Sequence, residues 1–237
     1  MIYFRGCVVR EKLPQIANAT ERILKKAGIE HEILDDENCC GSFLLRTGFH
    51  DDAIEVMEQT LKELEGRKIL VSCAGCYNTL KNDYKNLLGV ELDVIHTSQL
   101  FSQLIREGKL TLQKTPMKVT YHDPCHLGRH SGVYDEPREV LEAAAELVEM
   151  EDSRERSHCC GAGAGVKSVF PQTANKIAKK RIKDAENTGA DTIATACSFC
   201  ILNLKDTDKN SSENNENVLK VKDLSEILLM GLEDERI

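Results

Sequence analysis

The chain has 237 residues, of which 41% are hydrophobic and 30% charged, and its formal net charge is −8. This length allows one or two domains with a buried core. The acidic balance argues against a nucleic-acid-binding surface, because such surfaces neutralise phosphates with Lys and Arg. No apolar run approaches the ~18–20 residues that span a bilayer, and the N-terminus lacks the features of a secretory signal. We therefore expect a cytoplasmic protein that neither binds nucleic acid nor inserts into a membrane.

Short strands and amphipathic helices alternate along the first half of the chain. The clearest helical period lies just after the first strand, with Pro14 in its first turn and Gly28 as a stop. The patterns predict strands at Met1–Phe4, Ile69–Ser72 and Leu92–Ile95, and helices at Leu13–Ala27, Asp51–Glu65, Cys76–Asn86 and Ser98–Arg106.

The second half repeats this alternation. We expect strands at Lys118–Tyr121, Thr192–Ala196 and Val218–Val221, and helices around Pro137–Leu147, Gln172–Asn187 and Ser225–Glu233. The polar stretch Asp206–Asn217 lacks apolar anchors and is predicted to be a mobile surface loop. Strands that alternate with helices predict an α/β fold with short, mainly parallel sheets.

The ten cysteines fall into two sets of five with the same order. Each set reads as one Cys, a long gap, Cys-Cys-Gly, a second long gap, and Cys-x-x-Cys. The gaps are 31 and 32 residues in the first set and 33 and 36 in the second. The first set is Cys7, Cys39, Cys40, Cys73 and Cys76, and the second is Cys125, Cys159, Cys160, Cys197 and Cys200.

The repetition extends beyond cysteine, which indicates an internal duplication. KILVSCAGCYNTLK at residues 68–81 parallels TIATACSFCILNLK at 192–205, and LDVIHTSQLFSQLI at 92–105 parallels LKVKDLSEILLMGL at 219–232. The junction falls near Lys114–Met117. We therefore expect two similar α/β domains, residues 1–114 and 115–237, related by a pseudo-two-fold axis.

Several roles for the cysteines can be compared. Disulfides do not fit, because the cytosol keeps thiols reduced and each half has an odd number of them. Buried packing does not explain two matching sets. A structural zinc stays open, since Cys-x-x-Cys is a good half-site for an ion with four ligands. Cubane iron–sulfur clusters also take four thiolates. Adjacent Cys-Cys side chains tend to diverge and therefore suit two irons of one cluster, which favours a multi-iron cluster in each half.

The two sets resemble the CCG motifs of the heterodisulfide reductase catalytic subunit family. That family also includes iron–sulfur subunits of glycolate, lactate and glycerol-3-phosphate oxidising complexes. The segments HDPCHLGRHSGVYDEPR (122–138), HCCGAGAG (158–165) and TACSFC (195–200) are most similar to the reductase branch, and the resemblance covers nearly the whole chain. In that branch each complete motif holds a non-cubane [4Fe–4S] cluster through all five cysteines.

The resemblance implies two such clusters here, one for each cysteine set. It also implies a reaction, the two-electron reduction of the mixed disulfide coenzyme M–S–S–coenzyme B to two thiols. In this reaction the disulfide lies between the clusters, and each cluster delivers one electron and captures one sulfur. The alternative function is an iron–sulfur electron-transfer subunit of a flavin-dependent 2-hydroxyacid dehydrogenase that oxidises lactate or glycolate.

The resemblance also implies partner subunits. Fused members of the family carry a ferredoxin module ahead of the motifs, and this sequence shows none. We therefore expect a separate ferredoxin-like iron–sulfur subunit as electron donor, with a flavin subunit as a further candidate partner.

Other polar residues have both a functional and a plain interpretation. Four of the seven histidines lie near cysteines of the second set: His122, His126, His130 and His158. His126 directly follows Cys125 and is the candidate proton donor, although any one of these histidines also fits an ordinary loop residue. Arg129 is a candidate for binding a substrate sulfonate or phosphate, or an exposed ion-pairing residue. The basic run Lys176–Lys183 fits a solvated helix face or a docking site for an acidic ferredoxin-like partner.

Overall fold

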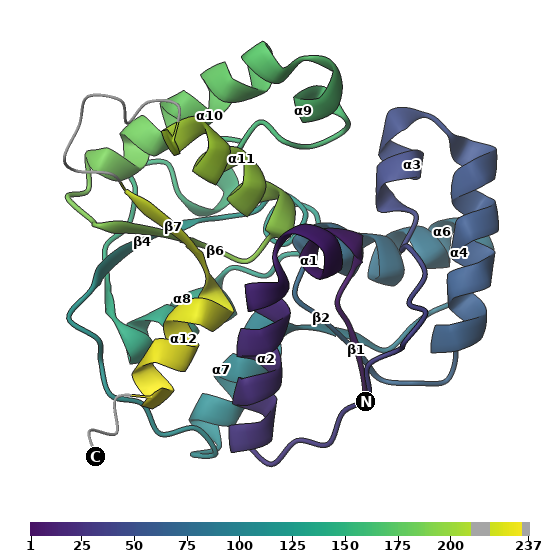
Figure 1. The fold of residues 1–237 in the computed structure, drawn as a ribbon, viewed down its shortest axis with the longest axis horizontal. Helices are drawn as coiled ribbons and strands as arrows, with labels where there is room; N and C mark the ends of the chain where they lie inside the picture. The colour runs from purple at the N-terminus through teal and green to yellow at the C-terminus, as the bar shows by residue number, and fades with distance from the viewer. Residues whose placement is uncertain (210–218, 234–237) are drawn as a thin grey trace.

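Two parallel sheets form the frame of the molecule, one from each half of the chain (Figure 1). The computed structural model describes residues 1–209 and 219–233. The first sheet has the order β1-β2-β3 and the second the order β5-β4-β6-β7. The strands are β1 (Ile2–Phe4), β2 (Ile69–Val71), β3 (Val94–His96), β4 (Lys118–His122), β5 (Glu146–Leu147), β6 (Thr192–Thr195) and β7 (Lys220–Asp223).

Helices connect the strands in both halves. In the first half they are α1 (Cys7–Lys12), α2 (Pro14–Lys26), α3 (Ser42–Thr47), α4 (His50–Leu64), α5 (Ala74–Asn78), the π-helical turn η1 (Thr79–Asp83), α6 (Tyr84–Leu88) and α7 (Thr97–Arg106). In the second half they are α8 (Asp135–Ala144), the 3-10 turn η2 (Arg154–Arg156), α9 (Val166–Val169), α10 (Pro171–Glu186), α11 (Ser198–Lys209) and α12 (Leu224–Glu233). The predicted α/β class with short parallel sheets is confirmed.

Parallel register aligns the carboxyl ends of the strands. In the first sheet, Phe4 pairs with Val71, and Val71 with His96. In the second sheet, Thr195 pairs with both His122 and Asp223. Because parallel strands end at one edge, residues that follow them converge there. Four of the ten cysteines come two or three residues after such a strand end.

The last strand and helix of each half are capped in the same way, which supports the duplication. His96 Nδ1 accepts a hydrogen bond from the Ser98 N–H at 3.1 Å, and Asp223 Oδ1 accepts one from the Ser225 N–H at 2.9 Å. Both capping residues are buried. In each half, therefore, a buried acceptor at the strand end satisfies a free N–H group of the following helix.

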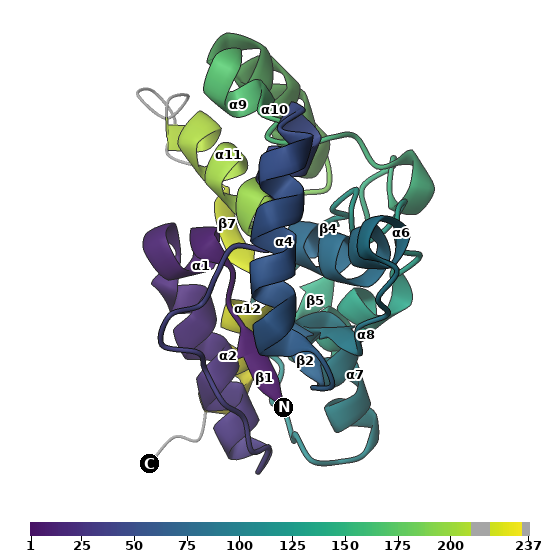
Figure 2. The same cartoon turned by 90° about the vertical axis from the view of Figure 1, so that its right-hand side faces the viewer.

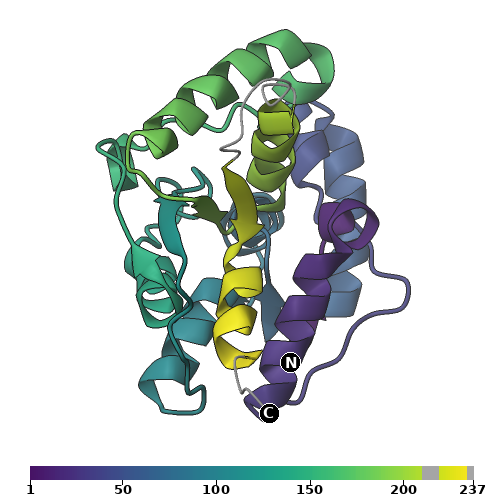
Figure 3. The same ribbon diagram turned by 60° about the vertical axis from the view of Figure 1, so that its left-hand side comes forward.

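The two halves share one interface. Helices α2 and α7 of the first half pack against α8 and α12 of the second, and α12 lies beside α2 (Figure 3). The Lys26 ammonium donates to the Leu232 carbonyl at 2.9 Å across this interface.

Helix α4 covers the outer side of the first half, with α6 beside it (Figure 2). One buried apolar cluster runs from Ile2 to Leu232 through both sheets. The proposed boundary at residues 114/115 lies between α7 and β4 and stays a prediction.

The structure corrects several predicted elements. The helix expected at Pro137–Leu147 ends at Ala144, because Ala145 is extended and residues 146–147 pair with β4 as β5. Helix α11 was not among the predicted helices. It includes residues 206–209, which were expected to begin a loop, and residues 210–217 lie outside the described part of the chain. The short helices α1, α3 and α9 were not predicted, since four to six residues carry too little period to detect. Within residues 1–209 and 219–233, no helix combines the length and apolarity needed to cross a membrane.

A buried ion pair joins the end of β4 to α8 and gives a stability prediction. Arg138 contacts both carboxylate oxygens of Asp123, at 2.8 and 3.0 Å, and both side chains are nearly inaccessible to solvent. Removing one partner leaves the other charge without full compensation. We expect Asp123→Ala to lower the free energy of unfolding by about 3 kcal/mol, measured by urea denaturation.

The exposed pair Arg106–Glu139 provides the control. Arg106→Ala should leave the free energy of unfolding within error of the wild type, because solvent screens exposed pairs. Equal losses for the two variants would contradict the structural role given to the buried pair.

Candidate metal centre

The five cysteines of the first set line one pocket at the carboxyl edge of the first sheet. Three separate segments supply them, at residues 7, 39–40 and 73–76. Cys40, Cys73 and Cys76 are buried, and the other two are half-buried. The Cys40 thiol donates to Cys76 Sγ at 3.4 Å. The structure therefore brings the complete first set together.

The backbone around Gly6 leaves room for this set. Gly6 has φ +78°, and a Cβ at this position would lie 2.9 Å from Cys76 Sγ, so a side chain would be strained and would crowd the thiol. The carboxylate of buried Glu37 accepts hydrogen bonds from the Arg5 and Gly6 N–H groups, both at 2.8 Å. Glu37 thus fixes the turn that carries Cys7 to the pocket.

The second set lines an equivalent pocket in the second half. Cys160, Cys197 and Cys200 are buried, Cys125 is half-buried and Cys159 is exposed. The Gly161 N–H donates to Cys159 Sγ at 3.2 Å, which is an ordinary contact for a thiolate that binds metal. All ten cysteines therefore gather as the sequence predicts, five in each pocket.

A side chain from a neighbouring helix holds each Cys-Cys segment. The Thr60 hydroxyl of α4 donates to the Cys39 carbonyl at 2.7 Å. In the second half, Asn203 Nδ2 of α11 donates to the Cys160 carbonyl at 2.6 Å. Both peptides are thereby held in place by contacts that do not require a metal.

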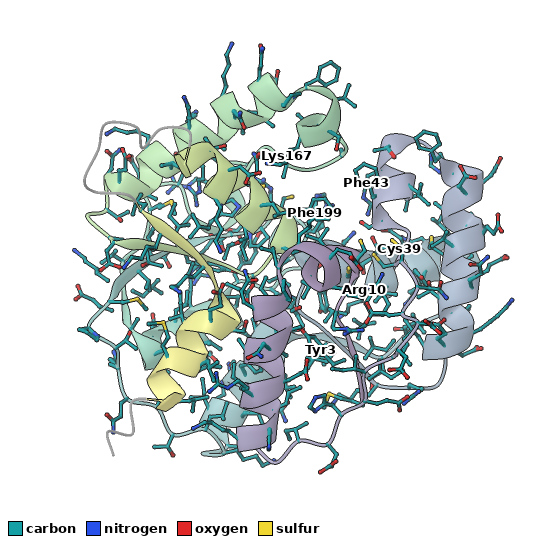
Figure 4. All side chains as sticks on the ribbon, viewed as in Figure 1. Tyr3, Arg10, Cys39, Phe43, Lys167 and Phe199 are labelled. Carbon is teal, nitrogen blue, oxygen red and sulfur yellow. The ribbon has the colours of Figure 1, made fainter. Side chains whose placement is uncertain are left out.

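The two pockets adjoin each other. They share four lining residues, which are Ser42, Phe43, Gly75 and Phe199. The Ser198 hydroxyl donates to Cys73 Sγ at 3.2 Å, so the two Cys-x-x-Cys segments are in direct contact. Figure 4 shows Phe199 in the middle of the molecule, with Phe43 on α3 to one side of it. Both rings line both cysteine pockets.

The donor chemistry of the pockets fits a multivalent metal group. Hydrogen bonds from Cys40 and Cys7 lower the pKa of Cys39 to about 3, so one thiolate forms readily in the first pocket. The contact with Cys39 raises the pKa of Cys40, and burial raises that of Cys125. Ionisation of the remaining thiols is unfavourable, because like charges would gather in a buried space. A soft cation that binds thiolates compensates these charges and makes ionisation favourable.

A family model described as a cysteine-rich domain, CCG, matches residues 1–81 and 119–205. The two matched segments contain all ten cysteines. The chain belongs to the CCG cysteine-rich domain family.

Curated relatives of this CCG chain are components of reductases and other oxidoreductases. It is 44% identical over 87% of its length to one subunit of the dihydromethanophenazine:CoB–CoM heterodisulfide reductase of Methanosarcina acetivorans, and it covers 53% of that subunit. It is 37% identical over 98% of its length to one subunit of the fumarate reductase (CoM/CoB) of Methanothermobacter marburgensis, of which it covers 46%. It is 35% identical over 98% of its length to EtfAB:quinone oxidoreductase of Syntrophomonas wolfei, of which it covers 34%. The CCG chain thus spans about half or less of these relatives.

A solved structure has the same fold. A hypothetical protein from Helicobacter pylori superposes with a TM-score of 0.68 at 10% identity, covering 99% of this CCG chain and 49% of that one. At this identity the likeness supports the α/β architecture alone.

His126 occupies the wall between the two halves of the CCG chain. It lines the second cysteine pocket, and its Nδ1 lies 4.0 Å from a Cβ built on Gly75 of the first Cys-x-x-Cys. Burial, with a contribution from Arg46, lowers the pKa of His126. The His130 ring lies 5.2 Å from the His126 ring and is exposed. His158, in contrast, pairs with a carboxylate: its Nδ1 lies 2.7 Å from Asp184 Oδ2.

His122 is buried and held in one tautomer. The Arg181 Nε–H donates to His122 Nδ1 at 3.1 Å, which leaves the ring proton on Nε2. A ring nitrogen of His122 lies within 4.8 Å of the Cys160 and Cys200 thiols. The pKa of Cys160 is lowered, chiefly by hydrogen bonds from Cys159 and Cys200 and to a smaller extent by the nearby His122 ring. His122 Nε2 itself is buried and has no hydrogen-bond partner among the described residues, so its N–H is available to a group bound at the second set.

Arg129 supports a loop of the second half. Its Nη1 donates to the Glu155 and Ser157 carbonyls, at 3.2 and 2.9 Å, and thereby holds the segment before Cys159. This contact occupies one nitrogen of an exposed side chain. Binding of a substrate anion by Arg129 stays a prediction.

The basic run Lys176–Lys183 is only partly solvated. Its lysines are exposed: Lys176, Lys179, Lys180 and Lys183. Arg181, in contrast, is fully buried and also donates to the Asp152 carbonyl at 2.9 Å. The expectation of a solvated face is therefore wrong for Arg181, which supports His122. Its position with Ala178 and Ile182 on the buried stripe of α10 was the signal that sequence analysis missed.

The space beside Gly6 gives a testable prediction about metal binding. Gly6→Ala places a methyl group against Cys76 and should lower the amount of metal that the first set retains. We expect about half of the metal of the wild type per chain, measured on protein purified without oxygen. Gly28→Ala is the matched control, because Gly28 also has positive φ but nothing lies within 4 Å of its Cβ position. Equal metal content in the two variants would contradict this interpretation of Gly6.

Proposed function

We propose that each cysteine set holds one [4Fe–4S] cluster of the non-cubane kind through all five thiolates. The first cluster would use Cys7, Cys39, Cys40, Cys73 and Cys76, and the second Cys125, Cys159, Cys160, Cys197 and Cys200. With both clusters, the chain would be the catalytic subunit of a heterodisulfide reductase-like complex. Its substrate would be a mixed disulfide of the coenzyme M–S–S–coenzyme B type.

The adjoining cysteine pockets are the observation that carries this proposal. A subunit that only conducts electrons needs metal centres in series and no space for a substrate between them. Here two complete sets meet along a wall that includes Phe43 and Phe199. A disulfide presents two sulfurs on one bond, which matches two equivalent centres that adjoin each other.

The proposed reaction balances with two electrons and two protons. The S–S bond of R–S–S–R′ is reduced and breaks, and the products are R–SH and R′–SH. When bound, the clusters would supply single electrons and iron that accepts thiolate sulfur. The chain itself would exclude water with Phe43 and Phe199. The His126 N–H would donate a hydrogen bond to one departing sulfur.

Partners and organisation follow from the same proposal. Electrons would come from a ferredoxin-like iron–sulfur subunit, with a flavin subunit as a further candidate, and several relatives are themselves named as subunits. The relative named EtfAB:quinone oxidoreductase favours a second candidate, an iron–sulfur subunit that only transfers electrons. Such a subunit could serve a flavin-dependent dehydrogenase of 2-hydroxyacids such as lactate or glycolate.

The ligand assignment predicts which cluster each variant loses. Cys197→Ser should abolish the second cluster and leave the first, because serine is a poor substitute for a thiolate ligand. Cys73→Ser should do the reverse, since the two residues hold equivalent places. Iron, acid-labile sulfide and zinc are counted, and paramagnetic resonance distinguishes the remaining cluster.

Two outcomes would contradict the assignment. Full retention of both signals in Cys197→Ser would show that this residue is not a ligand. Stoichiometric zinc without sulfide in the wild type would show that the site is a zinc module.

A disulfide assay separates the two candidate functions. With a reduced viologen dye as donor, the reductase should oxidise two dye radicals for each coenzyme M–S–S–coenzyme B consumed. Oxidation of the protein should also give a new paramagnetic species only when coenzyme M thiol is present. Electron transfer to an acceptor dye, together with no disulfide consumption and no response to thiol, would favour the electron-transfer subunit.

A further inference from the structure

A polar pocket lies beside the second cysteine pocket. It has a volume of about 610 Å³, within the usual range for small-molecule sites. Both halves of the chain contribute to it. It is lined by Arg46, Asn78, Asn82, Asp83, Lys85, Asn86, His126 and His130.

The π-helical turn η1 shapes this pocket. After Cys76 the helix passes through η1 at Thr79–Asp83 before it resumes as α6. A π-turn inserts one residue into a helix and rotates the side chains around it, and such turns are frequent at functional sites. Asn82 Nδ2 donates to Asn78 Oδ1 at 2.9 Å, so the two amides share one face at the pocket. Asp83, the last residue of the turn, holds Arg46 Nη2 at 2.5 Å.

A hydrogen-bonded network occupies the equivalent place in the second half. Lys167 on α9 corresponds to Arg46 on α3, since each lies on the short helix after a Cys-Cys-Gly. The Lys167 ammonium donates to Asn203 Oδ1 at 3.0 Å and to Asp206 at 2.7 Å. Asn203 also donates to the Cys160 and Ala174 carbonyls. Asp206 follows Cys200 by six residues, whereas Asp83 follows Cys76 by seven, and the extra residue falls within the π-turn.

Arg46 and His126 line both the polar pocket and the second cysteine pocket, so the two spaces adjoin each other. We infer that the polar pocket binds the anionic head group of one half of the disulfide. The part of the substrate that joins this head group to its sulfur would extend from the pocket toward the cysteine sets. This inference rests on the proposed function and names the class of substrate, a thiol whose tail ends in a sulfonate, carboxylate or phosphate.

The chemistry of the lining selects an anion. Arg46 is half-buried and permanently charged, and its planar group carries more N–H donors than the one that contacts Asp83. The amides of Asn78 and Asn82 and the ring N–H groups of the two histidines add further donors. The charge of Arg46 would repel a cationic head group at short range. A purely apolar head group would leave these donors without hydrogen-bond partners.

The asymmetry of the pocket has a consequence for the substrate. Two clusters in equivalent sites would treat both ends of a disulfide alike. A polar pocket on one side and a lysine–carboxylate network on the other distinguish the ends, so a mixed disulfide would bind in one orientation.

The test measures both binding and turnover with the cluster-containing protein. Ethanesulfonate is titrated into the protein by calorimetry to measure anion binding directly. Three small symmetric disulfides of similar length are then compared as substrates with reduced viologen: bis(2-sulfonatoethyl), bis(2-hydroxyethyl) and bis(2-aminoethyl) disulfide. Arg46→Leu should raise the KM for the sulfonate disulfide about tenfold or more, the size of a lost charge-assisted hydrogen bond, and the KM for the hydroxyethyl disulfide less than about threefold.

Lys167→Leu is the matched control and should leave both KM values near those of the wild type. Arg46→Lys should recover part of the loss, and iron content confirms that each variant is loaded. Saturable binding of ethanesulfonate that is lost in Arg46→Leu supports the pocket as an anion site. If this binding is seen but no disulfide is reduced, the pocket stands and only the proposed function fails. The inference is overturned if ethanesulfonate does not bind, or if Arg46→Leu affects the sulfonate and hydroxyethyl disulfides equally.

Discussion

Ten thiols packed into two adjoining pockets create the electrostatic constraint on which the structure depends. Burial and neighbouring sulfurs oppose the ionisation of most of them, while a few, such as Cys39, ionise easily. Without a cation most of these thiols stay protonated, because ionising them would gather like charges in a poorly solvated space. The parallel register of both sheets creates this situation, because it delivers the cysteine-bearing turns to the same edge. Gly6, Glu37, Thr60 and Asn203 then fix the turns by contacts within the protein.

Duplication explains the equivalence of the two pockets, and departures from duplication explain what differs between them. His96 and Asp223 cap equivalent helices, and Cys73 and Cys197 begin equivalent motifs. The π-turn after Cys76 has a regular helix as its counterpart in the second half. His122, fixed by Arg181, lies beside two thiols of the second set. The two cysteine sets are thus equivalent, whereas the residues around them differ. This difference suits a substrate whose two ends differ.

The α/β class and the grouping of the cysteines into two sets could be predicted from the sequence, because both depend on patterns that occur twice. Long amphipathic helices such as α2 and α4 were found close to their observed bounds, since a stripe of buried apolar residues specifies them. Short elements were not found, because α3 and α9 depend on the turns that precede them. Arg181 was misjudged because its burial requires a partner, His122, that is 59 residues away. The polar pocket could not be predicted, as it forms only where α3, η1 and the turn after β4 approach one another.

The central claim is that each cysteine set binds one iron–sulfur cluster and that the two clusters face each other. The most direct measurement is a crystal structure of the protein prepared without oxygen, with anomalous scattering recorded on both sides of the iron and zinc absorption edges. The account predicts two separate iron-rich sites, each bounded by the five cysteines of one set, with Phe43 and Phe199 between them. A single iron site, or scattering at the zinc edge in either pocket, would contradict it.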